Sequence, residues 1–297
     1  MTDRIIDLAD KPVRLSVRLE QLVIEYGEDE SATVPLEEVG VVVVSHPQVS
    51  FTHAVLAGIA AQGGTFVVCN EKHMPVGMIL PLESHHLQSE RFARQAAASL
   101  PTRKRLWQQL ISAKVKNQGH VLQQIRGDDH GLLALARMVK SGDRENVESR
   151  AARIYWRALF EDPGFRRDPD GEGFNGHLNY GYAVLRAIVA RAICAAGLHP
   201  ALGLHHHNRY DTFTLASDLM EPLRPLVDRA IVRYAGSAAP DAPFDRTAKT
   251  HLLTALTGRL TIGDEERTLF DVATTMASSL AQVHGGQRKE LLLPEIV

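Results

Sequence analysis

The hydrophobic pattern of this 297-residue chain changes its period near residue 80, and this change constrains the fold more than any other feature. Before it, residues 13–26 alternate apolar and polar side chains, which is typical of a strand with one buried face. Three further stretches are short and mostly apolar, as in buried strands: 39–44, 65–70 and 76–80. Residues 51–62 indicate one short helix, which Gly63 and Gly64 end. The first 80 residues therefore predict a β-rich domain with one embedded helix.

After Pro81 the spacing of apolar residues becomes helical, and Gly and Pro separate the helical stretches. The expected helices are 83–100, one that Pro101 opens, 129–141, 147–161, 177–196, 219–235, 244–258 and 264–283. The predicted fold class is α+β, with a small β-rich N-terminal domain followed by a larger all-α helical domain. The predicted boundaries are 1–80 for the β-rich domain, 81–100 for a linker helix, 101–286 for the helical domain and 287–297 for a C-terminal tail. We expect this tail to be loosely held or to dock on a partner as a strand.

Composition places the chain among soluble globular proteins and neither favours nor excludes a nucleic-acid partner. The net charge is −2 with histidine neutral, so a DNA-binding hypothesis depends on local sites and not on a basic surplus. Cys69 and Cys194 form no C-x-x-C pair, which excludes a zinc ribbon and a thioredoxin-like site and indicates two buried, reduced thiols. The N-terminus lacks a signal-peptide core, and no run of about 18 apolar residues occurs, so we expect a cytoplasmic protein.

Three polar features interrupt the helical patterns, and each has an ordinary explanation beside a functional one. Glu148 lies next to an apolar stripe, where a glutamate at a helix start also stabilises the macrodipole. Residues 205–207 are three consecutive histidines, which suit either metal binding or an exposed, solvated turn. Asp218 and Glu221 are spaced i, i+3 and share a helix face. An N-cap at Asp218 with Glu221 closing a capping box would account for both.

The combination of these features is more informative than any one of them. Two carboxylates and an imidazole from separate segments, without a cysteine ligand, suit Mg²⁺ or Mn²⁺ better than a structural zinc ion. A hard cation held by few protein groups keeps positions for water and phosphate oxygens. Phosphodiester chemistry requires such a site, because the metal neutralises the charge that develops in an in-line transition state.

Two segments resemble the signature blocks of the CRISPR-associated Cas-one (Cas1) family. The first is DRENVESRAARIYWRALF at 143–160, in which a glutamate precedes small residues and an aromatic helix. The second spans 174–228 and contains LNYGYAVL, a glycine three residues before a histidine, and DLMEPLRP. The resemblance covers nearly the whole chain, and it is greatest to the compact members that accompany type II systems.

The resemblance implies that Glu148, His206 and Glu221 are the catalytic residues and the metal ligands. His205 is the alternative ligand, and Asp218 is a neighbouring acid one helical turn before Glu221. The implied activity is that of a metal-dependent DNA integrase with endonuclease activity, which inserts short DNA fragments into a CRISPR array. The 3′-hydroxyl of the fragment would attack a repeat phosphodiester by transesterification, with Mg²⁺ or Mn²⁺ as the cofactor.

The family also implies a role for each domain and a set of partners. The β-rich domain would form a homodimer, and the helical domain would be catalytic. The expected partners are a second copy of the chain, a Cas-two (Cas2) dimer that bridges two homodimers, the double-stranded DNA fragment and leader–repeat DNA. The type II effector nuclease is a further expected partner, and no membrane is involved.

Basic residues in the helical part are candidates for holding DNA through its phosphates. They are Arg103, Lys104, Arg105, Lys114 and Lys116, expected on one helical hairpin, and Arg166 and Arg167 after the Glu148 helix. The ordinary alternative for each is a solvated helix face. Two other functions stay open: a stand-alone nuclease for branched or single-stranded DNA with the same ligands, and a non-enzymatic helical scaffold with degenerate acids.

Overall fold

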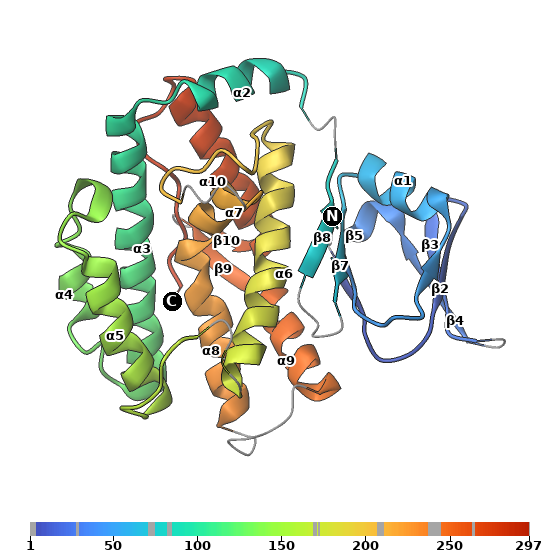
Figure 1. Ribbon diagram of the computed structural model, residues 1–297, viewed down its shortest axis with the longest axis horizontal. Helices are drawn as coiled ribbons and strands as arrows, with labels where there is room; N and C mark the ends of the chain where they lie inside the picture. Colours follow the sequence, from blue (N-terminus) through green and yellow to red (C-terminus); the bar gives the residue numbers. More distant parts are fainter. Residues whose placement is uncertain are drawn as a thin grey trace.

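The computed structural model describes residues 4–27, 30–70, 75–81, 85–168, 171, 173–206, 211–236, 245–262 and 265–296. Strands come first along the chain and helices follow, so the predicted α+β fold class is confirmed. Figure 1 shows the N-terminal strands and one short helix at one side of the molecule, and the other helices with a short two-stranded hairpin at the other. Within the described ranges, no helix is both long and apolar enough to cross a membrane.

The N-terminal part consists of two four-stranded sheets and one helix. The first sheet has the order β1-β5-β7-β8, in which β1, β5 and β7 are parallel and β8 is antiparallel. The second sheet has the order β4-β3-β2-β6. The bounds are β1 (Arg4–Leu8), β2 (Arg14–Arg18), β3 (Gln21–Glu25), β4 (Ser31–Pro35), β5 (Val39–Val44), β6 (Ser50–Phe51), α1 (His53–Ala61), β7 (Thr65–Cys69) and β8 (Pro75–Ile79).

Strand β5 joins the two halves of the molecule, because it is buried on both faces. Val41 and Val43 belong to the apolar core of the helices, together with Val67 of β7. Val42 and Val44, which point to the opposite face, belong to the core that the first sheet shares with the second sheet and α1. A strand covered on both faces has no polar positions, which explains the unbroken apolar run of this segment.

The stretch 13–26 was expected to be one strand, and it is instead the hairpin β2–β3. Leu19 and Glu20 form its two-residue turn, and both have positive φ angles, 51° and 57°. Two positive φ values in succession are typical of the hairpin turn whose twist matches the strands. This turn was not predicted, because neither residue is the glycine or asparagine typical of such turns, and β1 and β4 were not predicted either.

The helical part is built around α6, which is buried along most of its length. It contacts α7, α8, α9 and α10 and also strands β5 and β7. A Cβ atom at Gly181 would lie 2.5 Å from Val227 of α8, so the glycine of LNYGYAVL allows these helices to approach closely. The bounds are α2 (Gln88–Ala96), α3 (Leu100–Arg126), α4 (Leu132–Ala136), α5 (Val147–Phe160), α6 (Phe174–Ala195), α7 (Thr214–Leu219), α8 (Arg224–Ala235), α9 (Arg246–Leu256), β9 (Arg259–Ile262), β10 (Glu265–Thr268) and α10 (Leu269–His284).

Four expected helices differ from the observed ones, and the first of them, 83–100, is reduced to α2. The stretch 219–235 is not continuous, because the 3-10 turn Glu221–Leu223 separates α7 from α8 at Pro222 and Pro225. The stretch 264–283 begins as β10, which pairs with β9, before α10 starts. The stretch 129–141 contains only the short helix α4 and the 3-10 turn Ser141–Asp143.

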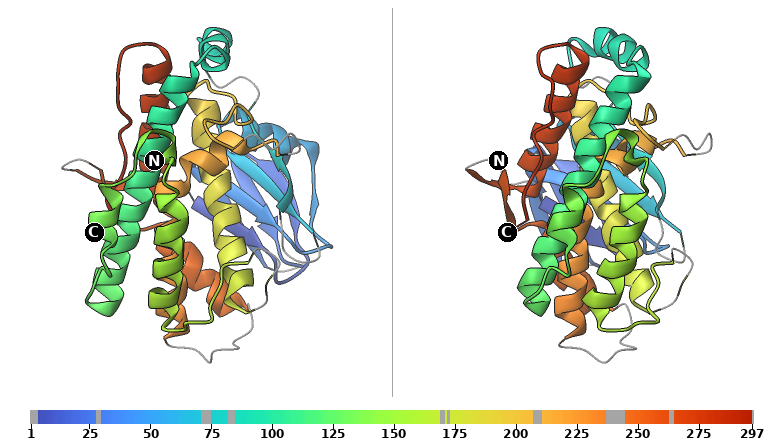
Figure 2. Two further views of the ribbon diagram at one scale, coloured as in Figure 1. Left: turned by 60° about the vertical axis from the view of Figure 1, so that its left-hand side comes forward. Right: turned by 90° about the vertical axis from the view of Figure 1, so that its left-hand side faces the viewer.

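Of the two expectations for the C-terminal segment, the loosely held tail is wrong, because buried Asn117 of α3 binds this segment. The side chain of Asn117 accepts a hydrogen bond from the backbone N–H of Ile296 at 3.1 Å and donates to the carbonyl of Pro294 at 3.1 Å. It also donates to the carbonyl of Pro222 at 2.8 Å. Figures 1 and 2 show the C-terminus beside α3, where these bonds connect it to the turn that carries Glu221.

Replacing Asn117 by alanine is expected to lower the free energy of unfolding by about 2–3 kcal/mol, because three buried backbone groups lose their partner. Urea denaturation followed by tryptophan fluorescence measures this change. The matched control is Gln123→Ala on the same helix, where the amide donates a hydrogen bond to the exposed carbonyl of Gly127. Equal stability of the two variants would contradict the prediction.

Candidate active site

Glu148 lies in the first turn of α5, and Asp143 fixes the start of this helix. The carboxylate oxygens of Asp143 accept hydrogen bonds from the backbone N–H groups of Val147 and Glu148, at 2.9 and 3.0 Å. Asn146, which precedes the helix, has a φ of 51°, a conformation that asparagine adopts more readily than most residues. The chain therefore turns sharply into α5 and directs Glu148 toward α3.

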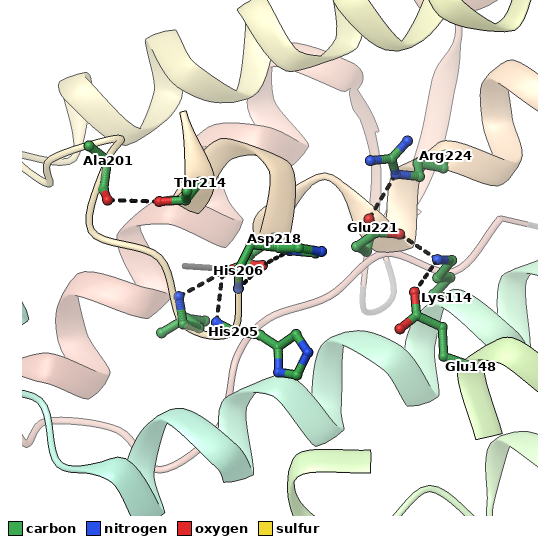
Figure 3. Close-up of polar contacts among 10 residues, drawn as sticks. Lys114, Glu148, Ala201, His205, His206, Thr214, Asp218, Glu221 and Arg224 are labelled. Carbon is green, nitrogen blue, oxygen red and sulfur yellow. Dashed lines mark hydrogen bonds and ion pairs between the residues drawn. The ribbon is translucent and has the colours of Figure 1, made fainter. Parts of the chain in front are cut away.

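The side chain opposite Glu148 is Lys114 of α3, and its ammonium lies between two carboxylates. The Nζ atom is 2.6 Å from Oε1 of Glu148 and 2.6 Å from Oε2 of Glu221, as Figure 3 shows. Burial opposes the charged form, but the charges of Glu221 and Glu148 outweigh it and raise the pKa of Lys114. The structure thus brings two of the three predicted ligands together around one positive charge.

Glu221 approaches this point from the turn between α7 and α8. Its side chain is only 5% exposed, and its Oε1 atom accepts a hydrogen bond from Nε of Arg224 at 2.9 Å. Burial alone would raise the pKa of Glu221, but the charges of Arg224 and Lys114 lower it below its ordinary value. Glu221 is therefore an ionised carboxylate with a cation on each side.

Asp218 does not cap a helix, so the capping-box interpretation is wrong. It is near the end of α7, fully buried, and its carboxylate binds the loop that carries the histidines. The Oδ2 atom accepts hydrogen bonds from the backbone N–H groups of Leu204 at 2.6 Å and His205 at 2.9 Å. The Oδ1 atom contacts the Nδ1 atom of His206. This hydrogen bond, opposed by burial, raises the pKa of His206.

The two described histidines of the triple have different surroundings. The ring of His205 is stacked on Trp107 of α3, with ring centroids 4.2 Å apart and planes 3° apart. The ring of His206 is held at Nδ1 by Asp218, which leaves Nε2 as the nitrogen that can bind a metal. The negative charges of Glu221 and Glu148 also contribute to the raised pKa of His206, so the ring is near enough to interact with both carboxylates. This geometry favours His206 over His205 as the predicted ligand, whereas His207 lies outside the described residues.

Gly203 is required by the shape of this loop. A Cβ atom at Gly203 would lie 2.6 Å from the carbonyl oxygen of His206 and 2.9 Å from Oγ1 of Thr214. That hydroxyl donates a hydrogen bond to the carbonyl of Ala201 at 2.7 Å and closes the loop, as Figure 3 shows. A side chain at this position would therefore push His206 away from Asp218.

We expect Gly203→Ala to lower the rate of the protein's reaction on DNA by about 100-fold, because a shift of about 1 Å in a catalytic group has an effect of this size. It should also destabilise the fold by about 1–3 kcal/mol through overpacking. A DNA strand-joining assay and thermal unfolding measure the two effects. Gly176→Ala is the control, because a Cβ atom there meets no atom within 4 Å. Wild-type activity of Gly203→Ala would contradict the role of this glycine.

The side chains gathered around Lys114 have donor groups of the kind that fits a hard divalent cation. The ammonium occupies the point on which the carboxylates of Glu148 and Glu221 converge. Oxygen ligands together with one imidazole suit Mg²⁺ or Mn²⁺. Within the part of the chain that the structure describes, no three His, Cys, Asp or Glu side chains are already grouped to hold an ion. A metal would therefore have to displace the Lys114 ammonium.

The predicted DNA contacts are not equivalent in the structure. Five of them lie on the single long helix α3 and not on a hairpin: Arg103, Lys104, Arg105, Lys114 and Lys116. Lys114 lies between the carboxylates of Glu148 and Glu221, and Lys116 forms an ion pair with Glu295. Arg166 is exposed, whereas Arg167 is half-buried and donates a hydrogen bond to Oδ1 of Asn175 at 3.0 Å. The guanidinium of Arg167 is therefore directed toward the start of α6.

Sequence reasoning missed the residues that organise this site. Asp143, Lys114 and Arg224 position or neutralise the predicted ligands, and none of them was assigned that role. The one available signal was their spacing, because Arg224 follows Glu221 by three residues and Asp143 precedes Glu148 by five. Lys114 gave no such signal, since it is 34 residues from Glu148 and its place depends on how α3 packs against α5.

Comparison with known proteins agrees with the resemblance seen in the sequence. The family model described as CRISPR associated protein Cas1 matches residues 8–263. A CRISPR-associated endonuclease Cas1 from Neisseria meningitidis serogroup C (strain 8013) is 36% identical over 287 residues, which cover 96% of this chain and 93% of that protein.

Solved structures show the same fold. A casposase bound to its integration product superposes with a TM-score of 0.79 at 20% identity, and the match covers 97% of this chain and 92% of that chain. A Cas6-RT-Cas1–Cas2 complex matches with a TM-score of 0.74 at 17% identity, over 98% of this chain and 36% of the longer chain there.

Proposed function

The chain belongs to the Cas1 family of CRISPR-associated proteins, and we propose that it is a metal-dependent DNA integrase with endonuclease activity that inserts short DNA fragments into a CRISPR array. The observation that carries this proposal is the convergence of Glu148 and Glu221 on one positive charge, the ammonium of Lys114. Its Nζ atom is 2.6 Å from a carboxylate oxygen of each glutamate. The relative from Neisseria meningitidis, which is named an endonuclease, supports the same class of activity.

The reaction we propose exchanges one phosphodiester for another. The 3′-hydroxyl oxygen of the fragment bonds to a phosphorus atom of the repeat, and the bond from that phosphorus to the 3′ oxygen of the target strand breaks. The attacking hydroxyl loses a proton, and the departing 3′ oxygen gains one. No nucleoside triphosphate is needed, since the number of phosphodiester bonds is unchanged.

The residues of this chain would act by holding and orienting the reacting groups. Glu148, Glu221 and Nε2 of His206 would hold Mg²⁺ or Mn²⁺, which when bound supplies Lewis-acid stabilisation of the developing phosphate charge. Asp218 would fix the tautomer and direction of the His206 ring through Nδ1. Arg224 would keep Glu221 ionised and in place through its hydrogen bond.

The proposed partners follow from the family. We propose that the chain acts as a homodimer with a Cas2 dimer, on a double-stranded fragment and on leader–repeat DNA. The similarity to a chain of a Cas6-RT-Cas1–Cas2 complex and to a casposase bound to its integration product supports partners of this kind. Association with the type II effector nuclease is a further part of the proposal.

A strand-transfer assay tests this function. The substrates are a supercoiled plasmid with a leader and a repeat and a labelled duplex with free 3′-hydroxyls, incubated with Mn²⁺ or Mg²⁺ and the cognate Cas2 protein. We expect metal-dependent covalent joining of the label at the leader–repeat junction, and no joining of a duplex with 3′-dideoxy ends. Cleavage without joining would favour the stand-alone nuclease, in which water replaces the 3′-hydroxyl at the same site.

A further inference from the structure

A small pocket of about 160 Å³ lies beside Glu221, between α6, the loop before it and the α7–α8 turn. Its lining is mostly polar and includes three arginines that come from different segments. The lining residues used below are Arg167, Arg186, Arg224, Asn179 and Tyr182. Arg224 connects the pocket to the candidate active site, because its Nε atom also donates to Glu221 at 2.9 Å.

The pocket carries more positive than negative charge. Only Arg224 among its three arginines has a carboxylate within ion-pair distance in the described ranges. Arg167 donates hydrogen bonds to two amide oxygens, those of Asn175 and Asn179, and neither oxygen carries a charge. Burial lowers the pKa of Arg167 and of Arg186; Tyr182 opposes this shift at Arg167 and the negative charge of Asp211 opposes it at Arg186, whereas the positive charge of Arg224 adds to it at both. An anion in the pocket would relieve this repulsion.

The guanidinium groups are held in place before any ligand arrives. Those of Arg224 and Arg167 lie over the ring of Tyr182, 4.6 and 5.4 Å from its centroid. The Tyr182 hydroxyl donates to buried Asp228, which also accepts a hydrogen bond from Tyr155 at 3.0 Å. Because the hydrogen bond to Asp228 fixes the Tyr182 ring, the two guanidinium groups that lie over the ring have a defined orientation.

We propose that this pocket binds a phosphate group of a DNA strand and so fixes the register of that strand against Glu148 and Glu221. The inference rests on the proposed function and adds a ligand site to it. Guanidinium forks match the oxygens of a phosphodiester, and several of them around one pocket select phosphate over a base. A base would need an aromatic face on which to stack, and the face of Tyr182 is already covered by Arg224 and Arg167.

The phosphate has two possible sources, the incoming fragment or the target repeat. The test replaces single phosphates near the reacting end of each strand by uncharged methylphosphonates. Binding is measured by fluorescence anisotropy in EDTA, so that no chemistry occurs. The variants are Arg186→Gln and Arg167→Gln, neither of which removes a proposed metal ligand. Arg14→Gln, an exposed arginine of β2, controls for the general loss of one positive charge.

We expect each pocket variant to bind DNA about 10-fold more weakly, with a log–log salt slope smaller by about 0.7–0.9, whereas Arg14→Gln binds nearly as the wild type does. One methylphosphonate should weaken the wild type about 10-fold and have no further effect on Arg186→Gln, because both changes remove the same contact. If the methylphosphonate that shows this coupling lies in the fragment, the bound phosphate comes from the fragment. If it lies in the target strand, the bound phosphate comes from the repeat.

Independent effects of the variants and of every methylphosphonate would overturn the proposal. Thermal unfolding of each variant guards against loss of fold, and Arg167→Gln gives a second measurement if Arg186→Gln is unstable. The outcome is separable from the proposed function. Coupling without strand joining would support the phosphate pocket and contradict the integrase function. Strand joining without coupling would support the integrase function and contradict the pocket.

Discussion

Replacing Glu148 or Glu221 by glutamine is expected to lower strand joining by at least about 1,000-fold, because an enzyme that loses about 4 kcal/mol of transition-state stabilisation slows by this factor. Glutamine keeps the volume of the side chain and removes the charge that would hold the metal. Both variants should also lose Mn²⁺ binding in a calorimetric titration, which gives a readout that does not depend on catalysis. Cleavage by the reverse reaction should fall together with joining, since both directions use the same site.

The matched control for these variants is Glu295→Gln. Glu295 is also a glutamate paired with a lysine of α3, but its side chain is 49% exposed and it lies in the C-terminal segment. Joining within about twofold of the wild type is expected for it. If Glu148→Gln kept full activity, the two carboxylates would have a structural role only. His206→Ala and His205→Ala, measured in the same titration, decide between the two histidines.

The fold could be predicted wherever one local pattern decided it. The apolar run 39–44 and the helix 147–161 correspond to β5 and α5, because burial on both faces and helical spacing are properties of the segment itself. The β2–β3 turn could not be predicted, since Leu19 and Glu20 adopt positive φ angles that the surrounding strands impose. The break at Pro222 was readable in principle, because a proline inside a helical pattern interrupts its hydrogen bonds.

The candidate site shows the same distinction between what a local segment determines and what tertiary packing determines. Carboxylates and an imidazole from separate segments favour a hard cation, because the preference of a metal for its ligands is a property of the side chains themselves, but the choice of Glu148, His206 and Glu221 came from the family resemblance. The partners of these residues depend on tertiary packing that no spacing reveals: Lys114 enters from α3, and Asp218 binds the histidine loop and not its own helix end. The capping box failed as an explanation because it considered only local partners for Asp218.

Replacing Lys114 by methionine is expected to lower the free energy of unfolding by about 3 kcal/mol in EDTA, because two carboxylates of a buried cluster lose their common counter-ion. The side chains of Lys114 and Glu221 are 13% and 5% exposed, so solvent screens this loss only weakly. A divalent cation should then reverse the loss, since it can occupy the place of the ammonium without competition. At about 100 times its Kd, Mn²⁺ would restore about 2.7 kcal/mol.

The same variant should bind Mn²⁺ at least about 10-fold more tightly than the wild type, because the wild-type ammonium must move before a metal enters and its like charge opposes metal binding. Chemical denaturation with and without Mn²⁺, followed by the fluorescence of Trp107 and Trp156, measures stability, and calorimetry measures affinity. Lys116→Met is the control, because its pair with Glu295 is exposed and contributes little. If Mn²⁺ fails to stabilise Lys114→Met more than the wild type, the ammonium does not occupy the metal position, and Lys114 only joins α3 to α5 and the α7–α8 turn.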